Sequence, residues 1–415
     1  MSSYNKFERY IAKFLEKNPK LKLFVKRSYQ FIQYKLKSGG PRCVSNSDVL
    51  RVSTAELPSF FGYYDKSCWN PSSSYVAYHK VLDKKAVICI RCSSTKIEQE
   101  IDVSDCWNWQ QGSMITWIDD HHLVYNGKNG NKLGCYIYSI LTGKKDFIIY
   151  PIQALSKDKE SMASINYLRL TKMRPDYGYN IECENYSSEL SLGDDGINIF
   201  SFANKKVSYF LSLKTIVEFS TENSMKNATH KLNHLSYSPD SKKIAFMHRW
   251  FDSGYKRTRL LILDLNTKEL CCVFNNVMFS HYDWVSNECI FAWCRGSNGD
   301  GYYMISTSKP SSIPTELFEV EGLAINANGD GHPSVSPDGR FIITDTYPAK
   351  DRMQSLILID LEEKSAKTLA KVFSPWKYQG LERCDLHPRW SPCSKYVAFD
   401  STHEDVRGLY KVNVC

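Results

Sequence analysis

A short motif recurs three times in the second half of the chain. Its fullest copy, GDGHPSVSPDGRFIITD from Gly329 to Asp345, joins two β-branched runs through a Ser-Pro-Asp-Gly turn. Pro337 presets a turn φ and Gly339 tolerates the positive φ that closes the turn, so each copy predicts two antiparallel strands. The other two copies begin at His234 and His387.

Weaker copies extend the pattern along the rest of the chain, at a period of roughly fifty residues. Seven units of four strands predict an all-β fold, a seven-bladed β-propeller over residues 41–415. Its 415 residues are too many for most single cores, but they suit a ring in which each unit buries a face against its neighbour. The last unit lacks one strand, and the alternating segment 48–55, DVLRVSTA, is expected to supply it and close the ring.

The first 40 residues form a separate basic extension. They carry ten Lys or Arg against two Glu, which equals the net charge of +8 of the whole chain. Apolar residues spaced as on one helix face predict amphipathic helices over 7–15 and 21–36, interrupted at Pro19. We expect this extension to bind an anionic membrane surface. The alternative is a pair of helices docked on the protein itself, and the neutral remainder argues against nucleic-acid binding.

The fourteen cysteines are scattered and form no metal-type pair. With no signal peptide evident, they are interpreted as reduced thiols of a cytoplasmic protein, attached peripherally to the inner membrane through residues 1–40.

A histidine precedes the Ser-Pro by four residues in all three clear copies. These are His234, His332 and His387, and aligning Phe291 with Phe246 adds His281. Equivalent first-strand positions line the channel of a propeller, so the four imidazoles are predicted to converge. Such a set suits one divalent metal, Mn, Fe, Ni or Zn. In the alternative, each histidine only holds its own blade together through a hydrogen bond to backbone.

The Ser-Pro-Asp-Gly turn, the strand after it and the downstream Asp-Leu strand resemble the TolB-type propeller repeat. The histidine before the turn resembles the oligogalacturonate lyase family, propellers in which histidines of successive blades hold a divalent metal that binds a uronate carboxylate. The resemblance implies lyase chemistry on an acidic glycan. The chain departs from the family pattern at one position. The family has a Gln three residues before one of its histidines, whereas this chain has Gly329 there, beside Asn328.

β-Elimination from a uronate needs a neutralised carboxylate, a base for the C5 proton and an acid for the leaving oxygen. His248 and Arg249 end the second strand of the fourth blade, at the rim where its first strand begins. We assign carboxylate neutralisation to Arg249 or the metal, the base to His248, and the acid to a tyrosine or water. The alternative for His248 is a surface histidine at a strand end.

Further residues are predicted to bind the sugar. The segment FFGYYDK offers stacking and hydrogen-bonding groups, with Gly62 allowing close backbone approach. The candidate substrate-binding residues are Tyr63, Tyr64, Asp65, Lys66, Arg295, Arg383 and Arg389.

Together these features predict a carbohydrate-active propeller that cleaves a uronate-containing oligo- or polysaccharide in bacterial surface-polysaccharide metabolism. The basic extension and FFGYYDK also resemble, more weakly, propeller proteins encoded in bacterial surface-polysaccharide gene clusters. Two alternatives stay open. One is a sugar-transferring enzyme of O-antigen or capsule biosynthesis at the inner membrane face, and the other is a non-catalytic propeller that binds glycan or protein.

Overall fold

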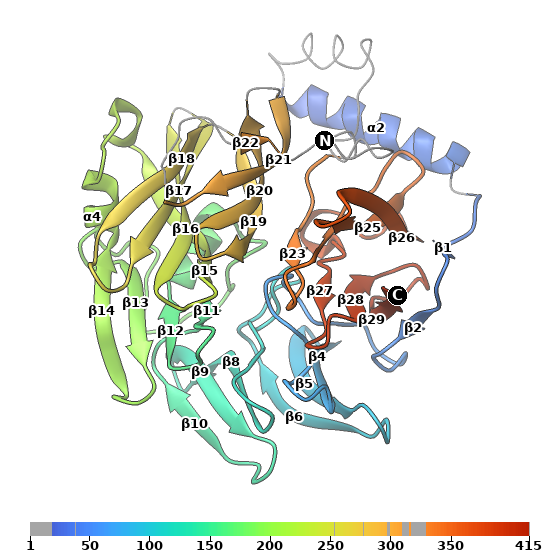
Figure 1. Ribbon diagram of the computed structural model, residues 1–415, viewed down its shortest axis with the longest axis horizontal. Coiled ribbons are helices and arrows are strands. Elements are labelled where there is room, and N and C mark those ends of the chain that lie inside the picture. Colours follow the sequence, from blue (N-terminus) through green and yellow to red (C-terminus); the bar gives the residue numbers. More distant parts are fainter. Residues whose placement is uncertain are drawn as a thin grey trace.

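Seven antiparallel sheets surround a central channel in the computed structural model (Figure 1). It describes residues 19–37, 39–252, 254–276, 278–296, 299–308, 315–316 and 329–414. The predicted seven-bladed β-propeller is confirmed. Among the described residues, no helix is long and apolar enough to cross a bilayer. The thirteen described cysteines all carry free thiols.

Each blade takes its strands from consecutive stretches of chain. Blade 1 consists of β3 (Ser59–Phe60), β4 (Tyr75–Leu82), β5 (Lys85–Cys92) and β6 (Glu98–Ser104). Blade 2 consists of β7 (Thr116–Trp117), β8 (His122–Asn129), β9 (Lys132–Ser139) and β10 (Lys145–Ile148). Blade 3 consists of β11 (Ala154–Leu155), β12 (Ser161–Ser164), β13 (Gly196–Ser201) and β14 (Lys206–Ser212). Blades 4 and 5 consist of β15 (Thr229–Tyr237), β16 (Lys243–Asp252), β17 (Tyr255–Asp264) and β18 (Leu270–Asn276); and β19 (Phe279–Ser286), β20 (Cys289–Gly296), β21 (Gly299–Ser306) and β22 (Thr315–Glu316). The short helices α3 (Tyr167–Met173) and α4 (Leu213–Glu218) belong to blade 3 and its exit.

The ring is closed by strands from before the first blade. Blade 7 holds β27 (Arg389–Trp390), β28 (Tyr396–Ser401) and β29 (Gly408–Asn413), and β2 (Val49–Arg51) pairs with β29 as its fourth strand. Blade 6 holds β23 (Ser334–Val335), β24 (Phe341–Asp345), β25 (Met353–Asp360) and β26 (Ser365–Phe373), and β1 (Cys43–Ser45) extends it as a fifth strand. These pairings cover the outer edges of two blades, which leaves fewer unpaired backbone groups.

The repeated turn links neighbouring blades. In blade 6 the Ser336 hydroxyl donates to Asp338 at 2.5 Å, and Gly339 adopts φ 76°. Ser394 replaces that glycine in blade 7, and its hydroxyl accepts the Asp338 N–H at 3.3 Å. Ser241 of blade 4 accepts the Asp158 N–H of blade 3 in the same way, at 3.0 Å. The serines therefore fill the strained turn position with a contact to the preceding blade.

Helix α2 (Pro19–Lys37) lies outside blade 6 (Figure 1). Phe31 and Tyr34 pack on Trp376 with ring centroids 5.4 and 5.6 Å apart, whereas Ile32 and Leu36 remain 55 % and 74 % exposed. Ile32 and Leu36 of the predicted apolar stripe thus point to solvent, whereas Tyr29 of the same stripe lies against Lys350 of blade 6. The helix expected over residues 7–15 lies outside the described residues.

Candidate functional site

Four histidines of consecutive blades lie in one buried arc at the channel axis. The ring centroids of His234 and His281 are 5.4 Å apart, those of His281 and His332 4.2 Å, and those of His332 and His387 4.3 Å. Each side chain is almost fully buried. The structure therefore brings together all four residues predicted to hold a metal.

Tyr63 and Tyr64 fill the centre of this arc. The Tyr63 ring lies 5.0 Å from His234 and 5.1 Å from His387, and its hydroxyl is 2.5 Å from His234 Nδ1. The Tyr64 hydroxyl donates to the Tyr282 carbonyl at 3.0 Å. Gly62 makes this placement possible, because a Cβ there would lie 2.7 Å from the Gln111 backbone. Tyr63 thus faces the histidines, while Tyr64 is held by blade 5.

Irregular backbone aims the histidines inward. His234 and His387 adopt positive φ of 54° and 45°, a conformation uncommon for residues other than glycine. The pairing of β15 with β16 shifts register at His234, and that of β19 with β20 shifts at His281. Bulges of this kind redirect a side chain, and backbone strain of this kind clusters at functional sites.

Carboxylates orient two of the histidines from behind. Asp345 accepts from His332 Nδ1 at 2.8 Å and from the His387 backbone N–H at 3.0 Å, while Asp330 lies 3.1 Å from His281 Nδ1. Burial disfavours charge on His332, but Asp345 outweighs it and raises the pKa of that imidazole. Burial and the neighbouring histidines hold the pKa of His281 and of His387 well below the usual range.

The geometry fits a divalent metal. The Nε2 atoms of His332 and His387 are buried and have no hydrogen-bond partner. One ligand atom each of His332, His387 and Asp385 lies within 4.8 Å of the others. Neutral imidazoles backed by carboxylates are the usual environment of metal-ligating histidines. Asp385 was not predicted from the sequence, although it lies two residues before His387, close enough in the chain for both side chains to bind one metal.

His234 stands apart from this group. Both of its ring nitrogens lie within 2.7 Å of the Tyr63 hydroxyl. His281 adjoins His332 and can approach the same metal, but its Nδ1 faces Asp330. The group of ligand atoms therefore contains two of the four predicted histidines and one carboxylate that was not predicted.

Three cations line one face of blade 4 beside the histidines. Lys231 of β15 pairs directly with Arg249 of β16, and Lys256 of β17 follows on the same face. Within the described chain, none of them has a carboxylate at ion-pair distance, and Arg249 Nε is buried without a partner. Burial and the charge of Arg174 lower the pKa of Arg249 to about 10. Burial, then Arg249, Arg174 and Lys256, lower that of Lys231 to about 6.

A chain of ion pairs borders these cations. Asp176 bridges Arg174 and Arg383 at 3.0 and 2.8 Å, and Arg383 continues to Asp385 at 2.9 Å. Arg383 therefore reaches the predicted site, where it positions Asp385. Tyr177 and Tyr347 lie nearby, with ring centroids 5.9 Å from His234 and 5.8 Å from His332.

The assignment of His248 as the base is wrong. Its Nε2 lies 2.9 Å from His230 Nδ1, and its Nδ1 accepts from Arg259 Nε at 3.0 Å. Strand alternation points His248 to the face of β16 opposite Arg249. Both of its ring nitrogens are thus occupied by residues of blade 4, and Arg259 in turn donates to the carbonyl oxygens of Ile216 and Phe219.

Two arginines predicted to bind substrate are engaged elsewhere. Arg295 forms a half-exposed pair with Asp300 in its own hairpin, at 2.7 Å. Arg389 is buried against Asp400 and also donates to the carbonyl oxygens of His387 and Gly62. Because Asp400 accepts the N–H groups of Phe61 and Gly62, the Arg389–Asp400 pair fixes both the tyrosine segment and His387.

Arg389→Met should lower the free energy of unfolding in urea by about 3 kcal/mol or more, because it leaves the Asp400 carboxylate buried without its cation. Arg295→Met removes one partner of an exposed pair and should change it by less than about 1 kcal/mol. Equal losses in the two variants would contradict the structural role given to Arg389.

Asp65 and Lys66 do not join the histidines. They pair with each other at 2.8 Å and line a separate cavity with Trp69 and Thr116. Of the four residues predicted in FFGYYDK, only Tyr63 and Tyr64 contact the histidine arc.

The comparisons bear on the fold. No protein-family model and no curated protein matches the chain. Oligogalacturonate lyase from Vibrio parahaemolyticus is 13 % identical over 90 % of this chain and 96 % of its own, with a TM-score of 0.59. An oligogalacturonate lyase in complex with manganese is 13 % identical over 91 % and 95 %, also at 0.59. The chain is a seven-bladed β-propeller, and its fold resembles that of oligogalacturonate lyase.

Proposed function

We propose that the protein is a metal-dependent lyase that cleaves a uronate-containing oligo- or polysaccharide by β-elimination. One observation carries the proposal. The unpartnered histidine nitrogens beside Asp385 share a buried channel with Arg249 and Lys231, which have no carboxylate partner among the described residues. A carboxylate ligand supplies the negative charge that Arg249 lacks.

His332, His387 and Asp385 would hold the metal, with His281 adjacent. Mn, Fe, Ni and Zn all accept this mixture of imidazole and carboxylate. A bound metal would supply Lewis-acid polarisation of the uronate carboxylate, which would acidify the C5 proton. Asp345 keeps the ring of His332 oriented and its Nε2 directed at the site.

The remaining steps fall to side chains of the cationic face and its neighbours. Arg249 binds and neutralises the carboxylate. Lys231, whose pKa is about 6, holds an unprotonated amine at neutral pH and removes the C5 proton in place of His248. Burial raises the pKa of Tyr177 and of Tyr347, so either phenol keeps its proton and can donate it to the leaving oxygen.

Purified protein loaded with each metal should convert oligogalacturonate or another uronate glycan into a product with an unsaturated uronate, which absorbs in the near ultraviolet. Neutral glycans of the same length serve as the control. A protein that consumes nucleotide sugar and releases no unsaturated product would instead be a transferase. One that binds glycan without turnover would be a scaffold.

Membrane attachment through residues 1–40 is part of the proposal. The docked helix α2 presents Phe24, Ile32 and Leu36 to solvent, in an extension that carries the whole net charge of the chain. Apolar side chains surrounded by lysines suit the surface of an anionic bilayer, where each basic residue contributes about 1 kcal/mol.

The triple variant Phe24→Ser, Ile32→Ser, Leu36→Ser should cosediment at least about tenfold less with vesicles containing an anionic phospholipid, since each buried apolar side chain contributes about 1.5–3 kcal/mol. Its melting temperature should not change, because these residues face away from the blade. The matched control replaces Ile97, Val103 and Leu141, which are similarly exposed on blades 1 and 2. Equal binding by both variants would argue against attachment through α2.

A further inference from the structure

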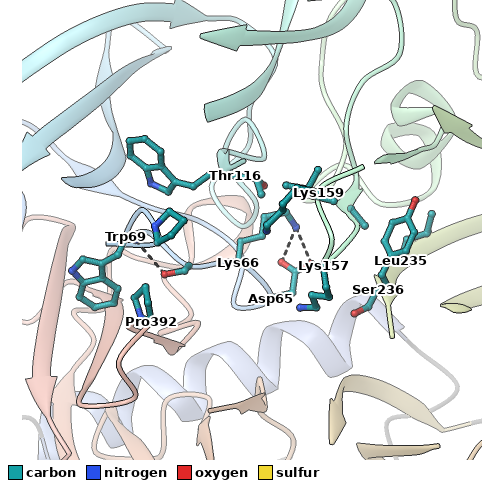
Figure 2. A pocket seen from close by; sticks show the side chains of 15 residues that line it. Asp65, Lys66, Trp69, Thr116, Lys157, Lys159, Leu235, Ser236 and Pro392 are labelled. Atoms are coloured by element: carbon teal, nitrogen blue, oxygen red, sulfur yellow. Dashed lines mark hydrogen bonds and ion pairs between the residues drawn. The ribbon is translucent and has the colours of Figure 1, made fainter. Parts of the chain in front are cut away.

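A cavity separate from the histidine arc has Pro392, from the Ser-Pro turn of blade 7, in its wall (Figure 2). Its volume is about 240 Å³, and first strands of blades 2, 3 and 4 supply Trp117, Leu155 and Ser236 to its wall. Trp69 and Pro392 close the side formed by blades 1 and 7. Pockets for drug-sized ligands span about 300–1,000 Å³, so this cavity suits a smaller ligand.

The lining is cationic. Lys66, Lys157 and Lys159 gather around Asp65, the one carboxylate in the described lining (Figure 2). Asp65 neutralises Lys66, with both carboxylate oxygens at 2.8 Å. Among the described residues, no carboxylate lies within ion-pair distance of Lys157 or Lys159. Burial and then Lys157 lower the pKa of Lys159 to about 8, as expected for ammonium groups that share a cavity.

The two unpaired lysines are held on a fixed turn. The Ser156 hydroxyl donates to Asp158 at 2.6 Å, the Glu160 N–H donates to the same carboxylate, and Lys159 N–H donates to the Ser156 carbonyl at 3.1 Å. Asp158 is also bound to blade 4 through Ser241. The lysines therefore stand at the cavity before any ligand arrives, which lowers the entropic cost of binding.

The chemistry of these cations distinguishes the cavity from the histidine site. None of the described lining residues is an arginine, so the positive charge of this cavity comes from lysines alone, whereas the histidine site has Arg249. Lysine acts as a compact point charge and is a common phosphate ligand. Trp69 and Trp117 add apolar walls of the kind that pack against a sugar ring.

We propose that this cavity binds a phosphate group through Lys157 and Lys159, either as free phosphate or as the phosphate of a small sugar. Its excess of two positive charges matches a phosphate dianion. Tyr63 and Tyr64 contact the histidines, whereas Asp65 and Lys66, which follow them in the chain, line the cavity, so the cavity is separate from the histidine arc. The inference is independent of the lyase proposal.

Calorimetric titration of the full-length protein tests it with three probes, namely inorganic phosphate, glucose 1-phosphate and glucuronate. We expect both phosphates to bind, with affinity falling as salt rises, and glucuronate to bind at least tenfold more weakly to the variant His332→Ala, His387→Ala, in which the histidine site is lost. The variant Lys157→Ala, Lys159→Ala should lose at least tenfold in phosphate affinity. The matched control Lys144→Ala, Lys205→Ala removes two exposed lysines from outer turns and should bind as the unmodified protein does.

Comparison of the probes and variants distinguishes free phosphate from a sugar phosphate, and the cavity from the histidine arc. Tighter binding of glucose 1-phosphate than of inorganic phosphate assigns the cavity to a sugar phosphate, and the reverse order to free phosphate. Binding retained in His332→Ala, His387→Ala places the phosphate away from the histidines, whatever the lyase assay gives. Absence of phosphate binding, phosphate binding unaffected by loss of Lys157 and Lys159, or glucuronate binding that is tighter than phosphate binding and is lost with Lys157 and Lys159 would each overturn the proposal.

Discussion

Alanine at both His332 and His387 should leave the purified protein without a stoichiometric divalent metal and without lyase activity. These two imidazoles present the buried, unpartnered Nε2 atoms of the site, so their removal takes away two of three expected ligands. Loss of a partner behind a metal ligand already costs about 10–100-fold in metal affinity, and loss of two ligands must cost more. Elemental mass spectrometry and the near-ultraviolet assay measure the two effects.

A graded variant and a control sharpen this prediction. Asp345→Asn keeps both histidines but weakens their orientation, so metal affinity should fall by about 10–100-fold. His121→Ala, His122→Ala removes two surface histidines and should leave metal content unchanged. A double variant of His332 and His387 that folds and still retains metal would refute the site, as would unmodified protein that binds none.

The fold could be predicted because the residues that form the repeated turn can be recognised in the sequence. Pro337 and Gly339 fix one turn, and serines that replace the glycine keep it while contacting the preceding blade. The pairing of β1 with β26 was not predicted, because a three-residue edge strand joins through backbone groups that any sequence offers. The 7–15 helix remains a prediction.

The histidine arc was predictable for the same reason. A fixed offset from a repeated turn becomes a fixed position in each blade, even where bulges and left-handed residues set the final direction of the ring. Side chains outside the repeat gave no such signal. Lys231, Lys256 and Asp385 reach the site from strands and loops of single blades, so only the three-dimensional arrangement brings them together.

The error at His248 has a simple physical cause. Neighbouring residues of a strand point to opposite faces, so His248 and Arg249 could not both face the channel. The same alternation could have identified Lys231, which pairs with Arg249 across the first two strands of blade 4. Arg295 and Arg389 were chosen by nearness in sequence, which does not reveal that each already has a carboxylate partner.

Lys231→Met should lower kcat by about 10²–10⁴-fold, the usual contribution of a positioned general base. Its amine must be unprotonated to accept the C5 proton, so kcat/KM of the unmodified protein should rise with pH through about 6 and then level off. Burial lowers this pKa most, Arg249, Arg174 and Lys256 lower it further, and Asp176 raises it. In the variant, the residual activity should lose this acidic limb.

Lys256→Met provides the matched test, because it removes a cation from the same face without removing the base. With one positive charge fewer, the pKa of Lys231 should rise, so the acidic limb of the pH profile should move to higher pH while kcat on the plateau is largely kept. If Lys231 had a purely structural role, its replacement would lower activity equally at every pH. The acidic limb of the pH profile of Lys256→Met would then lie at the same pH as that of the unmodified protein. If the acidic limb is unshifted in Lys256→Met and still present in Lys231→Met, the base is therefore another group.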